Sequence, residues 1–424
     1  MSYTKRDKKH LWHPLTQHGL NTDHLPIVKA KGSYLYDDTG KSYIDGIASW
    51  YTCMYGHCNP EITGPIKKQI DELDQVVFSG FTHPPAIEFS EKLVAILPQG
   101  LNKIFFSDNG STSVDVAIKM ALQYYFNRGE KKSKIIALEN AFHGDTFGAM
   151  SVSGLSVYNG PFEEFLLEID RIPVPNKENI ESVKAEFLAH LQNGEVAAFI
   201  FEPLVQGAAA MHMYEEKYLN ELMDMARQYG ALNIADEVMT GFGKTGMNFA
   251  SDYLDLAPDI MCLSKSLTGG VAPMAVTCAT NQVFDAFCDT EISKGFFHGH
   301  TYSANPLACT AASAGIDLLT SVSIQESIRR IHAEQLAFEK VVSQHATVKK
   351  TRVKGVILAL DLNVETDRYG GLRDKLFRFF MDEGVFLRPL GNTIYILPPF
   401  TITRLELEKI HNAIIKCLRT LSYD

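Results

Sequence analysis

Six short apolar runs alternate with stretches of helical periodicity, and this alternation limits the chain to a small set of folds. The apolar runs are 103–107, 134–138, 196–201, 231–235, 259–263 and 274–279. The helical stretches are 86–97, 113–126 and 215–229. Strands that alternate with helices form a mostly parallel sheet with helices on both faces. The sequence therefore predicts an α/β fold with a mostly parallel sheet and flanking helices.

The pattern changes near both ends of the 424-residue chain, which is longer than a single average core requires. We predict a large domain over 56–320 and a smaller α+β domain over 321–424. The N-terminal segment 1–55, with a hairpin predicted over 32–45, is expected to contribute to the small domain and the substrate pocket. The elements predicted after residue 320 are helices at 324–343 and 405–421 and strands at 353–360 and 395–397.

Charge and composition exclude several classes of partner. The formal net charge of −10 argues against nucleic acid or an anionic membrane as a partner. No apolar run approaches the roughly 20 residues that a membrane span needs, and the basic N-terminus lacks the apolar segment of a secretory signal. Seven cysteines without CxxC spacing, and no zinc motif, predict reduced thiols, no metal site and a cytoplasmic protein.

Two apolar runs in the middle of the chain are followed by a charged residue that the run itself does not explain. Asp236 follows 231–235, and Lys265 lies just beyond 259–263. Ligands bind at the carboxyl ends of strands in an open parallel sheet, so both charges should face one crevice. A sheltered acid on a ring nitrogen and a half-buried lysine that attacks a carbonyl are what pyridoxal phosphate requires. The alternatives are a helix N-cap for Asp236 and a loop charge for Lys265.

Two loops after predicted strands are candidates for holding a phosphate and a ring. Gly110 and Ser111 belong to the segment DNGST, where a helix begins, and such a segment cradles a phosphate or simply caps the helix. Phe142 offers a flat apolar face, although aromatic residues often pack in cores, and His143 opens a tight polar turn.

Three further positions are candidates for the surroundings of a ligand. Glu202 follows the third apolar run and should lie beside Asp236, where two carboxylates share hydrogen bonds or one orients another group. Arg388 follows an apolar strand and suits a substrate carboxylate, or else forms a surface or interdomain salt bridge. Trp50 and Tyr51 lie in a segment predicted to be extended, where one side chain packs in the core and the other lines a cavity.

Six blocks of sequence occur in an order that resembles the class III, fold-type I, pyridoxal-phosphate aminotransferases. They are DNGST, HGDTFGAMS, EPLVQG, IADEVMTGFGKTG, SKSLTGG and HGHTYSANPLA, and they span nearly the whole chain. LWHPLT, NAFHGDTFGAMS and RPLGNTIYILPP further resemble the members that convert 8-amino-7-oxononanoate to 7,8-diaminononanoate in biotin biosynthesis. The resemblance implies ping-pong transamination with pyridoxal 5'-phosphate, in a homodimer whose subunits share the active site.

The resemblance also implies a role for each candidate residue. Lys265 would bond covalently to the cofactor and move the proton, and Asp236 would keep the ring nitrogen protonated. The other cofactor-binding residues that it implies are Gly110, Ser111, Phe142, His143, Glu202 and, from the partner subunit, Thr301. The substrate-binding residues that it implies are Leu15, Trp50, Phe142, Lys265, Gly299, Tyr395 and Arg388, the last for the substrate carboxylate.

Three residues depart from the usual pattern of this family. Leu15 and Phe142 each stand where a tyrosine is usual, so two hydroxyl groups are lost. Lys244 replaces an arginine, which turns a bidentate contact into a point-charge contact. These departures leave the amino donor open between S-adenosylmethionine and lysine. The other readings are an ω-aminotransferase for a diamine or ω-amino acid, and a non-catalytic nucleotide- or phosphate-binding α/β protein.

Overall fold

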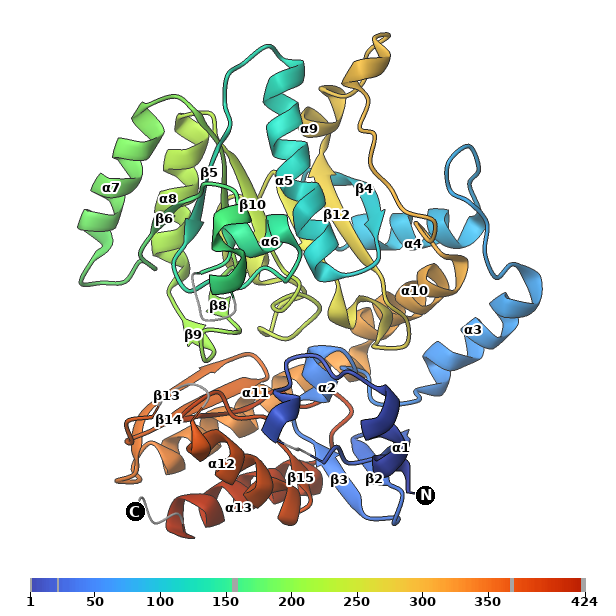
Figure 1. Ribbon diagram of the computed structural model, residues 1–424, viewed down its shortest axis with the longest axis vertical. Coiled ribbons are helices and arrows are strands. Elements are labelled where there is room, and N and C mark those ends of the chain that lie inside the picture. The colour runs from blue at the N-terminus through green and yellow to red at the C-terminus, as the bar shows by residue number, and fades with distance from the viewer. Residues whose placement is uncertain (1, 21–22, 155–158, 367–369, 421–424) are drawn as a thin grey trace.

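A seven-stranded sheet lies in the upper half of the molecule (Figure 1). The computed structural model describes residues 2–20, 23–154, 159–366 and 370–420. The strands of this sheet are β4 (Leu101–Ser107), β5 (Lys134–Leu138), β6 (Asp170–Ile172), β7 (Val196–Phe201), β10 (Leu232–Asp236), β11 (Ile260–Leu263) and β12 (Ala275–Thr280). Their spatial order is β4-β12-β11-β10-β7-β5-β6. β12 pairs antiparallel with both of its neighbours, β11 and β4, and the other four pairs are parallel, so the sheet is mostly parallel, as predicted.

Helices cover both faces of this sheet, and alternate strand residues pack against opposite layers. The helices are α3 (Pro60–Glu72), α4 (Pro84–Val94), α5 (Gly110–Asn127), α6 (Phe147–Val152), α7 (Ile180–Gln192), α8 (Glu216–Gln228), α9 (Asn281–Asp285) and α10 (Pro306–Thr320). In β7, Ala198 and Ile200 share a buried cluster with α5, whereas Phe199 and Phe201 share one with α7 and α8. Strands buried on both faces are apolar throughout, which explains the uninterrupted runs. The α/β prediction is confirmed.

The lower half of the molecule brings the N-terminal segment beside the C-terminal elements (Figure 1). One sheet contains β1 (Ile27–Lys31), β2 (Tyr34–Asp37), β3 (Ser42–Asp45) and β15 (Val385–Phe386), and another contains β13 (Val348–Lys354), β14 (Ile357–Leu362) and β16 (Thr393–Ile396). The accompanying helices are α11 (Val322–Val342), α12 (Gly371–Asp382) and α13 (Arg404–Thr420). The predicted hairpin is β2–β3, and β3 pairs in parallel with β15. This pairing joins the two ends of the chain.

The remaining described elements are short apart from the first helix. They are α1 (Tyr3–His10), α2 (Ala48–Tyr51), β8 (Val205–Gln206), β9 (His212–Met213), η1 (His18–Leu20), η2 (Gly160–Phe165), η3 (Ala250–Tyr253), η4 (Lys265–Thr268) and η5 (Ile292–Lys294). In the described part of the chain no single helix has the length and apolar character to span a membrane. Among the described helices, α10 and α11 meet such a test only when taken together, and they bend by 65° where they join.

Two local predictions differ from the structure, and a third reaches beyond the described residues. The strand predicted over 353–360 is wrong, because Gly355 turns the chain between β13 and β14 with φ +55°. A Cβ at Gly355 would collide with the backbone of Thr245, so this turn needs glycine. The segment after Ile47 is not extended but forms the turn α2. The predicted helix at 405–421 is α13, although residue 421 lies outside the described residues.

Candidate active site

Three charged side chains meet at one edge of the large sheet, which we call the acid–lysine edge: Glu202, Asp236 and Lys265. Asp236 is the last residue of β10, and Glu202 directly follows β7. Lys265 begins η4, two residues after β11 ends. β10 pairs in parallel with both β7 and β11, so the carboxyl ends of all three strands point the same way. The sequence predicted this convergence.

Asp236 is held in place by a buried histidine. Its Oδ2 lies 2.7 Å from Nδ1 of His143, and its Oδ1 accepts a hydrogen bond from the Val238 amide at 3.0 Å. Both side chains are buried. The other ring nitrogen of His143, Nε2, is also buried and has no hydrogen-bond partner among the described residues. His143 therefore orients the acid and retains a free polar atom.

Glu202 adds a second carboxyl group beside Asp236. Its Oε1 accepts from the Phe142 amide at 2.9 Å, and its Oε2 accepts from the Gly207 amide at 3.1 Å. Burial raises the pKa of Glu202 to about 7, and repulsion from Asp236 adds to this rise. His143 and the two amides act in the opposite direction. Glu202 therefore fixes the loop that carries Phe142 while resisting ionisation.

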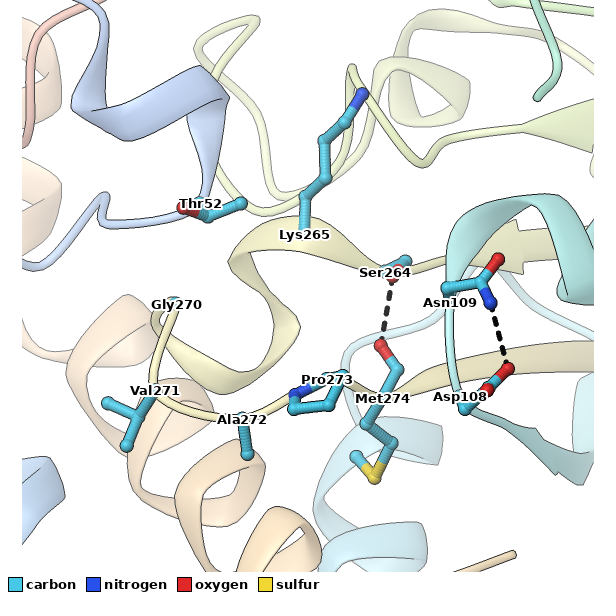
Figure 2. A pocket seen from close by; sticks show the side chains of 10 residues that line it. All are labelled: Thr52, Asp108, Asn109, Ser264, Lys265, Gly270, Val271, Ala272, Pro273 and Met274. Carbon is cyan, nitrogen blue, oxygen red and sulfur yellow. Dashed lines mark hydrogen bonds between the residues drawn. The ribbon is translucent and has the colours of Figure 1, made fainter. Parts of the chain in front are cut away.

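Lys265 presents an amine with a weakened hold on its proton. Burial lowers the pKa of Lys265 and outweighs the carboxylates of Asp236 and Glu202, which act to raise it. The residue has a left-handed φ of +50°, and its Nζ lies 5.3 Å from the centroid of the Tyr51 ring. Figure 2 shows the side chain standing away from its loop. An amine that gives up its proton more readily is a better nucleophile toward a carbonyl.

The cavity beside Lys265 has a volume of about 240 Å³ and ends at the N-terminus of a helix (Figure 2). Its lining includes Lys265, Asp108 and Asn109, together with the segment 270–274. Asn109 caps α5 by accepting a hydrogen bond from the Thr112 amide at 3.1 Å. Free amides at a helix N-terminus attract anions, as the phosphate interpretation of DNGST requires.

Two glycines keep the entrance to α5 closely packed. A Cβ at Gly110 would lie 2.7 Å from Cγ1 of Val238, two residues after Asp236. A Cβ at Gly144 would collide with the Ser111 hydroxyl, which accepts a hydrogen bond from the Asp145 amide at 3.1 Å. Side chains at these glycines would fill the space around the helix start. The start of α5 therefore packs directly against the acid–lysine edge.

Aromatic side chains from distant segments form what we call the aromatic wall: Trp50, Tyr51 and Tyr395. The Tyr51 hydroxyl donates to the Tyr395 hydroxyl at 3.0 Å, although 344 positions separate the two residues. The Arg388 guanidinium lies 4.7 Å from the centroid of the Trp50 ring. Arg388 is exposed and pairs with no acidic side chain in the described ranges. Its charge is therefore available to an anionic ligand.

The turn α2 that carries the first two aromatic residues has an unusual backbone. Ala48, Ser49, Trp50 and Tyr51 have φ values of +46°, +46°, +62° and +71°. A left-handed helical turn of non-glycine residues costs about 1–2 kcal/mol per residue, because each Cβ approaches the following carbonyl oxygen. Of the two residues, one of which was predicted to pack in the core and the other to line a cavity, Tyr51 is buried and Trp50 is half-exposed beside Arg388. Neither is among the residues that line the two cavities beside Lys265 and Asp108.

Other predicted site residues lie on the surface of the single chain. Leu15 and Phe142 are 56% and 43% exposed, and Gly299 and Thr301 are exposed as well. The neighbours of Thr301, His300 and Tyr302, line a second cavity of about 300 Å³ that shares Asp108 and residues 272–274 with the first. The roles of Leu15, Gly299 and Thr301 stay predictions.

Lys244 was noted only as a departure from a family pattern, but it lies close to the site. It is fully buried, and its Nζ donates to the Ser266 hydroxyl at 2.5 Å. Burial lowers the pKa of Lys244 well below its ordinary value, repulsion from Lys265 lowers it further, and Glu237 opposes both. The partner of Lys244 is thus a neutral hydroxyl and not a carboxylate, which is consistent with the lowered pKa of the amine. Sequence reasoning had no signal for Ser266.

The chain resembles known proteins over nearly its whole length. The sequence profile of the family described as Aminotransferase class-III matches residues 16–418. An adenosylmethionine-8-amino-7-oxononanoate aminotransferase of Synechococcus elongatus is 43% identical, with 96% of this chain and 98% of that protein covered. The crystal structure of such an enzyme from Methanocaldococcus jannaschii has a TM-score of 0.92 and 32% identity, with 98% of each chain covered. An omega transaminase from Pseudomonas jessenii in complex with PMP has a TM-score of 0.94 and 27% identity, covering 99% of this chain and 98% of its own.

Proposed function

Because this chain belongs to the class III aminotransferases, which depend on pyridoxal phosphate, we propose that it aminates 8-amino-7-oxononanoate in biotin biosynthesis. S-adenosylmethionine is the proposed donor. Over the two halves of the reaction, the amino group of the donor and the carbonyl oxygen of the acceptor change places. The products are therefore 7,8-diaminononanoate and the keto acid of the donor. The observation that carries the proposal is 43% identity, over nearly the whole chain, to a protein with that name.

The residues of the site fit pyridoxal phosphate. When bound, this cofactor supplies an electron-withdrawing ring that lets the substrate carbon lose and regain a proton. Asp236, oriented by His143, would hold a proton at the ring nitrogen, and Gly110 and Ser111 would hold the phosphate. Two observations support this fit: the unpartnered Nε2 of His143 and the lowered pKa of the Lys265 amine. Lys265 would hold the cofactor and transfer the proton.

The remaining cofactor contacts would come from the loop beside Glu202 and from a second subunit. Phe142 would stack on the ring, and Glu202 would fix its backbone through the amide contact described above. Thr301 of the partner subunit would contact the phosphate, so the working unit would be a homodimer. The exposure of Thr301 and of Tyr302, 64% for the latter, supports a neighbouring chain at this position.

The substrate would lie between the aromatic wall and the cofactor. Arg388 would bind the carboxylate of 8-amino-7-oxononanoate, and its exposed guanidinium, which pairs with no acidic side chain among the described residues, supports this role. Trp50, Tyr395 and Phe142 would contact the carbon chain, with Leu15 and Gly299 at the edge of the pocket. Aromatic surfaces with few fixed polar groups suit a pocket that must accept two unlike molecules in turn.

Seven cysteines, none of them in a disulfide, support the proposal of a reducing compartment such as the cytoplasm.

The test is an assay that supplies 8-amino-7-oxononanoate with either S-adenosylmethionine or lysine and measures 7,8-diaminononanoate. We expect product with S-adenosylmethionine. If product forms with lysine but not with S-adenosylmethionine, the proposed donor is rejected. Lysine is then the donor, the alternative that the leucine at position 15 raised. Absence of product with both donors, in a protein that binds pyridoxal phosphate and aminates other ketones, would reject the substrate and favour another ω-aminotransferase.

A further inference from the structure

The left-handed turn α2 is tied to the rest of the protein at both of its ends. Ser49, near its start, contacts the end of β3, and the carbonyl of Tyr51, at its end, contacts η4. Among the described residues, the side chains that make these ties form no hydrogen bond to Arg388 or Tyr395. Their position indicates a role that acts through the turn.

The first tie is a buried carboxylate that joins the turn to a histidine. Asp45, the last residue of β3, is fully buried, and its Oδ2 accepts from the Ser49 hydroxyl at 2.7 Å. The same oxygen lies 2.8 Å from Nε2 of His57. The backbone of His57 is fixed in turn, because its amide and carbonyl exchange hydrogen bonds of 2.8 and 3.0 Å with Gly32. Asp45 and His57 therefore hold Ser49 against a rigid strand.

The second tie joins the end of the turn to the segment that carries the reactive lysine. The Ser266 hydroxyl donates to the Tyr51 carbonyl at 2.8 Å. The same hydroxyl accepts from the buried amine of Lys244, which orients its proton toward Tyr51. Because Ser266 directly follows Lys265, this tie sets the position of the Tyr51 ring relative to the lysine amine.

Such ties are what a strained turn requires. L-residues avoid the left-handed region, so four of them in succession persist only when the surroundings over-determine the conformation. A turn released from Asp45 would relax toward ordinary dihedrals. Its side chains would then move, the Trp50 ring away from Arg388 and the Tyr51 ring away from Lys265.

We propose that Asp45, His57 and Ser266 are positioning residues for substrate selection, because they hold α2 left-handed and thereby place Trp50 against Arg388 and Tyr51 against Lys265. The consequence for the substrate rests on the proposed function, in which Arg388 binds a carboxylate beside the aromatic wall. The consequence for the geometry of the turn does not rest on it. The two are therefore tested separately.

Tryptophan fluorescence tests the geometry without any assay of activity. The chain has two tryptophans, so the full-length Trp12→Phe variant reports on Trp50 alone. In that background we expect His57→Gln and Ser49→Ala to shift the Trp50 emission to longer wavelength and to increase its quenching by acrylamide. His411→Gln is the matched control, because His411 is also partly buried and hydrogen-bonded but lies on α13 against Phe338. It should leave the emission unchanged.

Unchanged emission in both His57→Gln and Ser49→Ala would overturn the proposal. Ser49→Ala removes only one hydroxyl, so it carries the test if His57→Gln fails to fold, as judged by far-ultraviolet circular dichroism. A shift of the same size in His411→Gln would also overturn it, because the effect would then reflect general loosening.

Kinetics test the consequence for the substrate. We expect His57→Gln to raise the KM for the carboxylate-bearing keto substrate about tenfold and to change kcat less than about threefold, because the reactive groups stay in place. Asp45→Asn, which keeps the shape of the side chain, should give a smaller rise. If His57→Gln instead lowers kcat about tenfold and leaves the KM unchanged, the positioning role is overturned. If 8-amino-7-oxononanoate is not a substrate at all, the proposed function fails, whereas the fluorescence result still decides the geometry.

Discussion

The acid–lysine edge and the aromatic wall meet at Tyr51, yet they are built in opposite ways. Glu202, Asp236 and Lys265 stand at or just beyond the ends of three neighbouring strands, so regular sheet pairing brings them together. Tyr51 and Tyr395 come from a strained turn and a strand of another sheet. The edge therefore depends on topology that many core contacts maintain. The wall depends on a few hydrogen bonds between distant segments.

The difference indicates where each property of the site is determined. The positions and pKa values of the charged groups follow from the burial of strand ends, so they should survive changes in the lower half of the molecule. The shape of the pocket follows from the turn α2 and from Arg388. Changes there should alter which molecules bind and leave the reactive groups intact.

Removal of the lysine at the edge should have the largest effect. Lys265→Ala should lower the aminotransferase rate by on the order of a thousandfold or more, because no other amine occupies that position. Product formation and retention of the cofactor after dialysis measure the effect. Lys340→Ala, on the exposed side of α11, is the control and should behave as the parent protein. A variant that keeps more than about a tenth of the parent rate would contradict the role of Lys265.

A change beside the wall should act on binding rather than on chemistry. Arg388→Ala should raise the KM for 8-amino-7-oxononanoate by about 10–100-fold, the loss expected for a charge-assisted hydrogen bond of about 1.5–3 kcal/mol. The kcat should fall much less. Arg419→Ala, an exposed arginine in the last turn of α13, is the control. If kcat falls and KM stays constant, the distinction between the edge and the wall is wrong.

The second carboxyl at the edge should reveal itself through pH. The pKa of Glu202 is raised from 4.5 to about 7 in the fold, so its contribution to stability is complete below pH 4.5 and is lost as the pH rises toward 7. Glu202→Gln cannot titrate. Relative to the parent, the variant should therefore gain on the order of 3 kcal/mol between pH 4.5 and 8. Urea unfolding of the cofactor-free protein at several pH values measures this, and a constant difference would disprove the raised pKa.

The smallest effect is expected at Lys244, where the edge and the wall share a tie. Burial lowers the pKa of its amine, so its contribution to stability is present above the ordinary pKa of 10.5 and is lost as the pH falls through the lowered value. Lys244→Met has no amine to neutralise. The stability of the parent relative to this variant should therefore increase as the pH rises toward 10.5, and kcat should change less than about threefold. Thermal unfolding at pH 7 and pH 9.5 tests the direction, and the opposite trend would show that the amine stays charged.

Much of the upper half was predictable because its patterns are local. Strands that are buried on both faces are mostly apolar along their length, and this made β5 and β7 identifiable to the residue. Asp236 and Lys265 were recognisable because a charge directly after such a run needs an explanation. The strand predicted over 353–360 failed because Gly355 carries a turn, which hydrophobicity does not record.

By itself, then, the sequence determined the parallel sheet, the strand ends at which the charged groups lie, and the family resemblance. Only the tertiary structure decided that Ala48–Tyr51 is left-handed, that Ser266 and Lys244 support it, and that Trp50 and Arg388 lie together. The physical reason is the range of the interactions. Strand and helix patterns repeat every two to four residues, whereas a strained turn is stable only through contacts with residues that are remote along the chain.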